Sequence, residues 1–241
     1  MLLHGFHTVL GRLKRDAASI RAVYVDETRR DPRMRELLVQ AGRHGVTVNR
    51  VDAQRIEGLA PGRRHQGLVA LTTSAPPGTS LEELFADLSR PPRIVLLDGV
   101  TDPRNLGACL RAADGAGMHA VIAPRDHACP LSEAAVQTAA GAAESVPYLL
   151  VTNLSRCIGE LQERGLWVVG LDEEAEQTLW GASWPAEGSA FVLGAEGRGL
   201  RRLVKESCDI LVRLPMLGSI KSLNVAVATG VVLYEAVRRR L

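Results

Sequence analysis

The sequence is poor in cysteine and in long apolar runs. Its four cysteines, Cys109, Cys129, Cys157 and Cys208, are scattered and form no CxxC pair, which argues against a zinc site or a disulfide framework and suits a reducing cytoplasm. No run approaches the roughly 18 consecutive apolar residues that a membrane-spanning helix needs, and residues 1–16 lack the uninterrupted apolar segment of a signal peptide. We therefore expect a cytoplasmic protein with buried thiols, no metal and no membrane partner.

The sequence also lacks the glycine-rich loops that usually bind nucleotide phosphates. Residues 98–117, DGVTDPRNLGACLRAADGAG, follow an apolar run and open a predicted helix, which is the usual setting for such a loop. Neither GxGxxG nor GxxxxGK[ST] fits this stretch. It offers Asn105, Gly107 and Arg111 instead, so a different ligand chemistry is indicated.

Lysine is scarce, and arginine carries nearly all of the positive charge. Only Lys14, Lys205 and Lys221 are lysines, although lysines and arginines together number 29. Residues 1–73 hold 13 Lys+Arg against 7 Asp+Glu, a balance of +6, and the remainder holds 16 against 20, a balance of −4. Arginine binds phosphate through a bidentate fork and stacks on bases. The asymmetry favours a nucleic-acid-binding module joined to a second domain, although a solvated arginine-rich surface gives the same balance.

The apolar pattern divides the chain into two α/β parts. Residues 1–73 alternate short strands and helices, residues 74–91 form a linker, and residues 92–241 alternate continuous apolar strands with helices. Such strands indicate a parallel sheet that is covered on both faces. The expected strands are 22–25, 46–51, 67–71, 93–98, 119–124, 148–152, 166–171, 190–194 and 209–214. The expected helices are 31–44, 52–59, 81–89, 105–115, 132–142, 154–164, 200–207 and 222–240.

Three turns rich in glycine and polar residues follow strands of the second part. They are 98–107 (DGVTDPRNLG), 194–199 (GAEGRG) and 215–224 (PMLGSIKSLN). Ligands of open α/β sheets bind at the carboxyl ends of the strands. The three turns therefore predict one composite site.

Five polar residues in or near these turns are candidates for that site. Asn105 and Ser222 stand at expected helix starts, where both residue types are also common N-caps. Arg111 lies off the apolar stripe of its helix, so it is either solvated or close to a ligand. Glu196 is a carboxylate held in a glycine-dense turn. Asn224 falls inside the expected terminal helix, where asparagine is unfavourable, and a side chain that faces the site would explain it better.

Together, and in this order, the three turns resemble the motifs of the SpoU (TrmH-like) family of RNA ribose 2′-O-methyltransferases. The matching stretches are NLGACLRAA (105–113), FVLGAEGRGL (191–200) and LPMLGSIKSLNVAVATGVVLYE (214–235). HGFHTVL and HQGLVA resemble the N-terminal RNA-binding domain of the family. DGVTDPRNLGACLRAADGAGMHAVI and GAAESVP are especially similar to family members that methylate a guanosine ribose of bacterial 23S rRNA.

The resemblance implies a fold, a cofactor and a partner. It implies a small α/β RNA-binding domain like the ribosomal protein L30e, followed by a parallel-sheet domain with a deep trefoil knot that works as a homodimer. S-adenosylmethionine (SAM) would bind in the knot, mainly to backbone groups and apolar side chains. The corresponding positions here are Leu193, Gly194, Leu214, Met216 and Leu223.

The resemblance also assigns catalytic roles. Methyl transfer to a ribose hydroxyl needs the hydroxyl proton removed and the developing alkoxide stabilised. Arg111 matches the catalytic arginine of the family. The family's arginine is often described as the base. An arginine pKa above roughly 12 makes a neutral guanidine rare, and the alternative is that Arg111 binds the phosphate beside the target ribose and stabilises the alkoxide. Asn105 and Glu196 would orient Arg111, and Ser222 and Asn224 would position the ribose or close the pocket.

The expected substrate is a guanosine 2′-hydroxyl in 23S rRNA or its assembly precursor. Two alternatives stay open, namely transfer RNA as the substrate and a knotted, non-catalytic RNA-binding assembly factor. Lys221 and Ala226 depart from the family pattern without removing a proposed catalytic group. The candidate phosphate contacts in the first domain are Arg12, Lys14, Arg15, Arg63 and Arg64.

Overall fold

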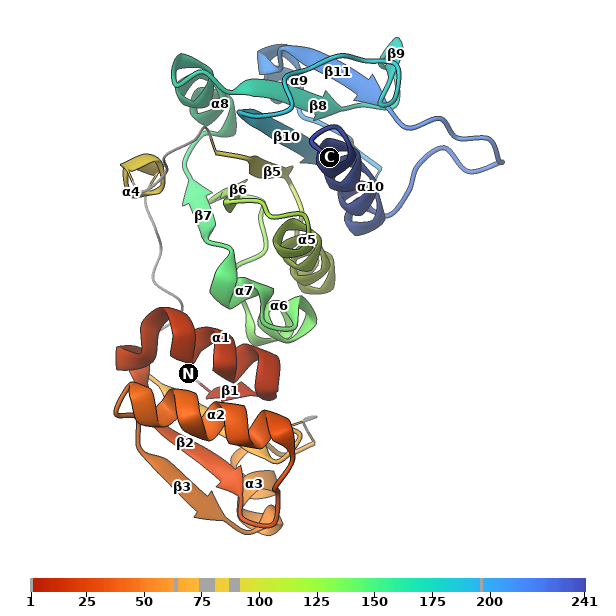
Figure 1. Ribbon diagram of the computed structural model, residues 1–241. Helices are drawn as coiled ribbons and strands as arrows, with labels where there is room; N and C mark the ends of the chain where they lie inside the picture. The colour runs from red at the N-terminus through yellow and green to blue at the C-terminus, as the bar shows by residue number, and fades with distance from the viewer. Residues whose placement is uncertain (1, 63–64, 74–80, 87–91, 196) are drawn as a thin grey trace. The chain divides into compact units, whose positions relative to one another are not determined.

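Two β-sheets organise the chain, one in each of two units (Figure 1). The computed structural model describes residues 2–62, 65–73, 81–86, 92–195 and 197–241. The first unit consists of Met1–Pro77 together with Ala140–Ser145, and the second of Gly78–Ala139 and Val146–Leu241. Most of the expected linker, residues 74–80 and 87–91, lies outside the described residues.

The first unit contains a four-stranded mixed sheet with the strand order β1-β4-β2-β3. β2 and β3 are parallel, whereas β4 is antiparallel to both of its neighbours. In chain order the elements are β1 (Leu2–His4), α1 (Phe6–Asp16), a 3-10 turn (Ala17–Ser19), β2 (Ile20–Asp26), α2 (Pro32–Arg43), β3 (Val48–Val51), α3 (Ala53–Leu59) and β4 (Leu68–Thr72).

Aspartate residues cap α2 and α3, and the sequence predicted both of these helices. The Asp31 carboxylate accepts hydrogen bonds from the backbone amides of Arg33 and Met34, and Pro32 occupies the first helical position. Asp52 caps α3 in the same way. The helix boundaries therefore follow from local chemistry that is visible in the sequence.

The first strand and the first helix were not predicted. Phe6, Val9 and Leu13 form the buried face of α1, but they are separated by histidine, threonine and arginine, so the apolar pattern is thin. The turn before the helix depends on Gly5, whose φ of 85° favours glycine. The Leu2–His4 strand is only three residues long, and its pairing partner, β4, lies more than sixty positions away.

Arg12 of α1 is fully buried, which corrects its assignment as an RNA contact. Its guanidinium forms a bidentate ion pair with the Glu144 carboxylate, which is equally buried, and donates to the Ser19 hydroxyl oxygen at 3.0 Å. Glu144 comes from α7 (Ala142–Ser145), the segment that packs within the first unit. A charged pair can be buried when each partner satisfies the other. A guanidinium placed in this way is not available to a phosphate.

We predict that Arg12→Ala destabilises the protein by about 3–5 kcal/mol, because it leaves the Glu144 carboxylate buried without its counter-ion. The double variant Arg12→Met/Glu144→Leu should be much closer to wild type in its free energy of unfolding, since neither charge then remains. Denaturant unfolding of the two variants checks the expectation. Equal destabilisation in both would show that packing volume, and not charge pairing, dominates here.

The second unit is built on a seven-stranded parallel sheet with the order β7-β6-β5-β10-β8-β11-β9, seen in the upper part of Figure 1. Its strands are β5 (Ile94–Asp98), β6 (Ala120–Pro124), β7 (Tyr148–Val151), β8 (Trp167–Leu171), β9 (Gln177–Thr178), β10 (Ser189–Gly194) and β11 (Ile210–Arg213). Its helices are α4 (Leu81–Ala86), α5 (Pro103–Gly115), α6 (Glu133–Ala139), α8 (Leu154–Glu163), α9 (Arg202–Ser207) and α10 (Val225–Arg238). The predicted parallel sheet is confirmed, and the short strand β9 is an addition.

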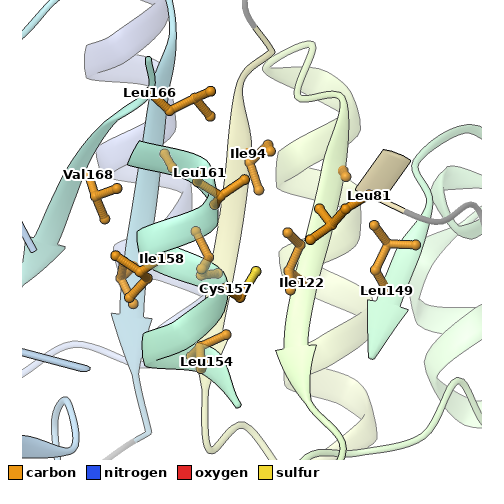
Figure 2. Packing of buried hydrophobic residues seen from close by; sticks show 14 of the residues in the cluster. Leu81, Ile94, Ile122, Leu149, Leu154, Cys157, Ile158, Leu161, Leu166 and Val168 are labelled. Atoms are coloured by element: carbon orange, nitrogen blue, oxygen red, sulfur yellow. The ribbon is translucent and has the colours of Figure 1, made fainter. Parts of the chain in front are cut away.

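Both faces of this sheet are apolar and covered by helices. All five residues of β5 and of β6 are buried. On one face Ile94 and Ile122 pack with Leu154 and Leu161 of α8, as Figure 2 shows. The helices α5 and α10 contact each other, and α10 also contacts β10. This two-sided burial explains why the strands are continuous apolar runs in the sequence.

Two helices differ most from their predicted extents, while α5 begins at Pro103 and α9 at Arg202, each two residues from the expected start. The helix expected over 132–142 breaks after α6, because Ala140 and Gly141 have positive φ values of 52° and 102°, and the chain continues into α7. The terminal helix begins at Val225 instead of Ser222. It was expected to be buried almost all round, but the side chains of Val227 and Tyr234 are about half exposed.

Cys109, Cys129 and Cys157 are buried as expected, whereas Cys208 is only partly buried. Burial raises the pKa of Cys109 to about 11 and those of Cys157 and Cys208 to about 12, so these three stay protonated at neutral pH. Within the described residues no helix is long and apolar enough to cross a membrane. The same part of the chain holds no group of three His, Cys, Asp or Glu side chains arranged as metal ligands.

Glu235 fastens the end of α10. Its buried carboxylate accepts hydrogen bonds from the guanidinium groups of Arg238 and Arg239 at 2.7–2.8 Å. Arg239 also donates to the Leu179 and Ala182 carbonyl oxygens and lies over the Trp184 ring. The hydrogen bonds from Arg238, followed by those from Arg239, lower the pKa of Glu235 from 4.5 to about 2.

A lowered carboxyl pKa contributes stability above its unfolded value, and that stability is lost as the pH falls. For Glu235 the loss should fall between pH 4.5 and pH 2. We predict that Glu235→Gln is less stable than wild type at neutral pH and that the difference narrows across this window. Unfolding free energies measured from pH 7 down to the lowest pH at which both proteins fold check the expectation, and a constant difference would contradict it.

Candidate active site

A cavity of about 330 Å³ opens at the carboxyl ends of β8, β10 and β11 in the second unit. Its volume falls within the roughly 300–1,000 Å³ of small-molecule sites. The second and third of the predicted turns supply nearly half of the described residues that line it. The five residues that the resemblance assigned to the cofactor all line it, and they are Leu193, Gly194, Leu214, Met216 and Leu223.

The wall formed by residues 194–200 depends on one very close backbone approach. A Cβ atom on Gly194 would lie 2.1 Å from the carbonyl carbon of Gly199. Ala195 and Gly199 form an isolated bridge, with the Gly199 amide donating to the Ala195 oxygen at 3.0 Å. Gly197 and Gly199 have φ values of 76° and 61°. Glycines are therefore required at Gly194 by space and at the other two positions by conformation.

A charged cluster forms another part of the wall. Asp172, which follows β8 directly, is buried, and its carboxylate accepts a hydrogen bond from Lys205 Nζ at 3.0 Å. Lys205 also donates to Glu174 at 3.1 Å. The hydrogen bonds that Lys205 donates to the carboxylates of Asp172 and then Glu174 raise the pKa of Lys205. The cavity thus joins apolar side chains to a fixed ion-pair network.

A hydrogen bond joins the first and third predicted turns. Asn224 Nδ2 donates to Asn105 Oδ1 at 2.9 Å. At the same time Asn224 Oδ1 accepts from the backbone amides of Ala226 and Val227. The amide of Asn224 therefore caps α10 with its oxygen and holds Asn105 with its nitrogen, which brings together two candidates that lie 119 positions apart.

The helix caps differ from those considered in the sequence. Asp102 caps α5, and its carboxylate accepts from the amides of Arg104 and Asn105, so the Asn105 side chain is left for Asn224. Asn224, and not Ser222, caps α10. The expectation that Asn224 lies inside the helix is therefore wrong. Ser222 is exposed and lines the cavity.

Arg111 is exposed on α5, while Leu106, Leu110 and Ala113 of the same helix are buried. Its predicted direction away from the apolar stripe is confirmed. It is not among the described residues that line the cavity. Arg104 lies seven positions earlier, on the same side of the helix, and is also exposed.

Four of the remaining candidates lie wholly or partly outside the described residues. Glu196, Arg63 and Arg64 lie outside the described residues, as does the side chain of Arg15. Lys14 is exposed and lies 3.5 Å from a Glu36 carboxylate oxygen. Asp172 and Lys205 were missed as part of the site. The position of Asp172 directly after a buried parallel strand is the signal that could have found it.

Comparison with known proteins places these features in a family. Residues 92–234 match the description "SpoU rRNA Methylase family", and residues 2–78 match "RNA 2'-O ribose methyltransferase substrate binding". The chain belongs to the SpoU rRNA methylase family. The family resemblance drawn from the three turns is thereby confirmed.

Similar proteins in this family are known from bacteria. The chain is 51% identical over 99% of its length to the 23S rRNA (guanosine-2'-O-)-methyltransferase RlmB of Ralstonia nicotianae, of which it covers 96%. A protein of the same name from Bordetella pertussis is also 51% identical, with 99% and 97% covered. The structure of the SpoU methyltransferase AviRb from Streptomyces viridochromogenes in complex with the cofactor AdoMet is similar with a TM-score of 0.79 and 25% identity, covering 100% of this chain and 90% of AviRb.

We predict that Asn105→Ala lowers the methylation rate without weakening the cap of α10, because Asn224 Oδ1 still accepts from the helix amides. Asn224→Ala should lower the rate and also destabilise the protein by about 1 kcal/mol, the usual contribution of an N-cap. Asn105→Asp keeps an acceptor for Asn224 and serves as the control. Methylation assays and thermal unfolding of the three variants test the assignment, and wild-type rates in Asn105→Ala would remove Asn105 from the site.

Proposed function

We propose that this protein transfers a methyl group from SAM to the ribose 2′-hydroxyl of a guanosine in 23S rRNA, in the cytoplasm. The observation that carries the proposal is the hydrogen bond between Asn105 and Asn224, because it joins the first and third family motifs next to a cavity lined by the second and third. The near-full-length similarity to proteins named for this reaction supports the substrate.

The cavity residues fit SAM in size and in chemistry. Four of the five assigned positions are apolar side chains. The fifth is Gly194, where a Cβ atom would clash with the backbone of Gly199. We assign the binding of SAM to Leu193, Gly194, Leu214, Met216 and Leu223. When bound, SAM supplies an electrophilic methyl group on a sulfonium. The cavity's role is to hold the cofactor in one orientation and to exclude water from it.

Arg111 is the residue that we assign to the ribose. Its permanent charge suits it to bind the phosphate beside the target nucleotide and to stabilise the alkoxide as the hydroxyl proton leaves. Asn105, held by Asn224, lies on the same helix and would fix the local geometry. Ser222 at the cavity wall would position the ribose. Glu196 completes the proposed set through its place in the second motif.

The first unit is the proposed RNA-binding module. Its match to the substrate-binding domain and its positive charge balance support this role. Lys14, Arg15, Arg63 and Arg64 remain the candidate phosphate contacts, whereas Arg12 is excluded by its burial with Glu144.

We further infer a homodimer and a knot in the second unit. Val227 and Tyr234 lie seven positions apart on α10 and are both about half exposed, and Leu217 and Ile220 nearby in sequence are more exposed still. Apolar surface of this kind is typical of a protein interface. The trefoil knot would involve residues 191–200 and 214–235, which jointly line the cavity.

Tritium transfer from labelled SAM to unmodified 23S rRNA, with a transfer RNA pool alongside and mapping of the modified ribose, tests the proposal. Label at one guanosine ribose of 23S rRNA is the expected result. Label in transfer RNA alone would keep the chemistry and replace the substrate. Absence of label from both, with SAM and RNA still bound, would indicate a non-catalytic assembly factor.

We predict that Arg111→Ala lowers kcat by about a hundredfold or more and leaves the Kd for SAM nearly unchanged, since removal of one group that stabilises developing charge commonly has that effect. Arg104→Ala, on the same face of α5, is the matched control and should keep kcat. Single-turnover rates at saturating SAM and calorimetric Kd values separate the two steps. A raised Kd for SAM with normal turnover at saturation would refute the role assigned to Arg111.

A further inference from the structure

Asp98, the last residue of β5, is a buried charge that the proposed mechanism does not use. Its side chain has no exposed surface, and it is not among the described residues that line the cavity. A carboxylate without water is costly unless charged and polar partners compensate it. The partners of Asp98 therefore indicate its structural role.

Among the described residues, the further hydrogen-bond partners of Asp98 lie at the two ends of the loop that follows β10. The Ala195 amide donates to the Asp98 backbone oxygen at 2.9 Å, which ties down the start of the loop. At its end, the backbone amide of Arg201 donates to Asp98 Oδ2 at 2.8 Å and Arg201 Nε donates to Oδ1 at 2.6 Å. Asp98 thus holds both ends of this loop, at Ala195 and at Arg201.

The described residues of this loop form one part of the cavity wall. Gly194, Ala195, Gly197, Arg198 and the two residues after it line the cavity. Ala195 and Gly199 also form a short bridge within the loop. The carboxylate end of β5 therefore sets where this wall stands.

We propose that Asp98 and Arg201 are positioning residues. They fix the part of the cavity wall around Gly194 and Gly199 for the cofactor, without touching the cofactor themselves. The inference rests on the proposed function, because it takes the occupant of the cavity to be SAM. Arg201 is about half exposed, with its guanidinium clamping a carboxylate that is fully buried. Charge-assisted hydrogen bonds of this geometry are the strong ones.

The test uses the full-length protein with substitutions at the exposed partner, since Asp98 variants could fail to fold. Arg201→Ala removes the side-chain clamp and leaves the backbone hydrogen bond, and Arg201→Lys keeps a charge near Asp98. Arg202→Ala is the matched control, because Arg202 is the next residue, is more exposed and forms an ion pair with Glu206 along its own helix. Calorimetry gives the Kd for SAM, filter binding gives the Kd for RNA, and hydrogen exchange follows single amides.

For Arg201→Ala we expect the Kd for SAM to rise about tenfold or more, the range of a lost hydrogen bond to a charged group, with the Kd for RNA unchanged. Arg201→Lys should recover part of the affinity, and Arg202→Ala should match wild type. The amides of Ala195 and Gly199 should exchange faster in Arg201→Ala, while that of Val192 within β10 should not.

Two results would overturn the inference. The first is a wild-type Kd for SAM with unchanged exchange at Ala195 and Gly199. The second is weakened RNA binding with SAM binding intact, which would make Arg201 a phosphate contact. If the wild-type protein bound no SAM, the proposed function would fail, and the exchange of the two amides would still decide whether Arg201 clamps the loop.

Discussion

The contact between the backbone at Gly194 and the backbone at Gly199 is the constraint on which the site depends. At this point β10 ends against its own loop, with no space for a single added carbon atom. The strand lies between β5 and β8 in the sheet, so the loop is delivered to the centre of the carboxyl edge. The cavity has its wall there because the main chain can turn back on itself at glycine and at few other residues.

Asn224, which caps α10, also binds a residue of the candidate site. Helix caps and site residues are usually counted separately, yet the two ends of one amide serve both purposes in Asn224. The backbone amides of Ala226 and Val227 bind the Oδ1 atom of Asn224, so the Nδ2 atom of the same side chain faces Asn105. The orientation of a residue on α5 is in this way set by the first turn of a helix more than a hundred positions later.

The parts of this structure that the sequence predicted are those with a strong local or periodic signal. The strands β5, β6 and β10 were predicted because burial on both faces leaves continuous apolar runs. The helices α2 and α3 were predicted because Pro32 suits the first turn of one and Asp52 can cap the other. The location of the site followed from three turns after such strands. The sequence could not show partners far apart in the chain. Arg12 was taken for a surface arginine because no residue near it in the sequence indicates Glu144. Asn224 was placed inside α10, although its side chain caps this helix and binds Asn105, 119 positions away.

The short segment Ala140–Ser145 has a consequence for how the protein can be divided. It lies between α6 and β7 in the sequence, but it packs with the first unit. A fragment that began at residue 92 would carry Glu144 without Arg12, leaving a carboxylate whose counter-ion had been cut away. The two units are consequently not interchangeable parts, and recombination between residues 74 and 91 would produce a chimera that lacks one half of an ion pair.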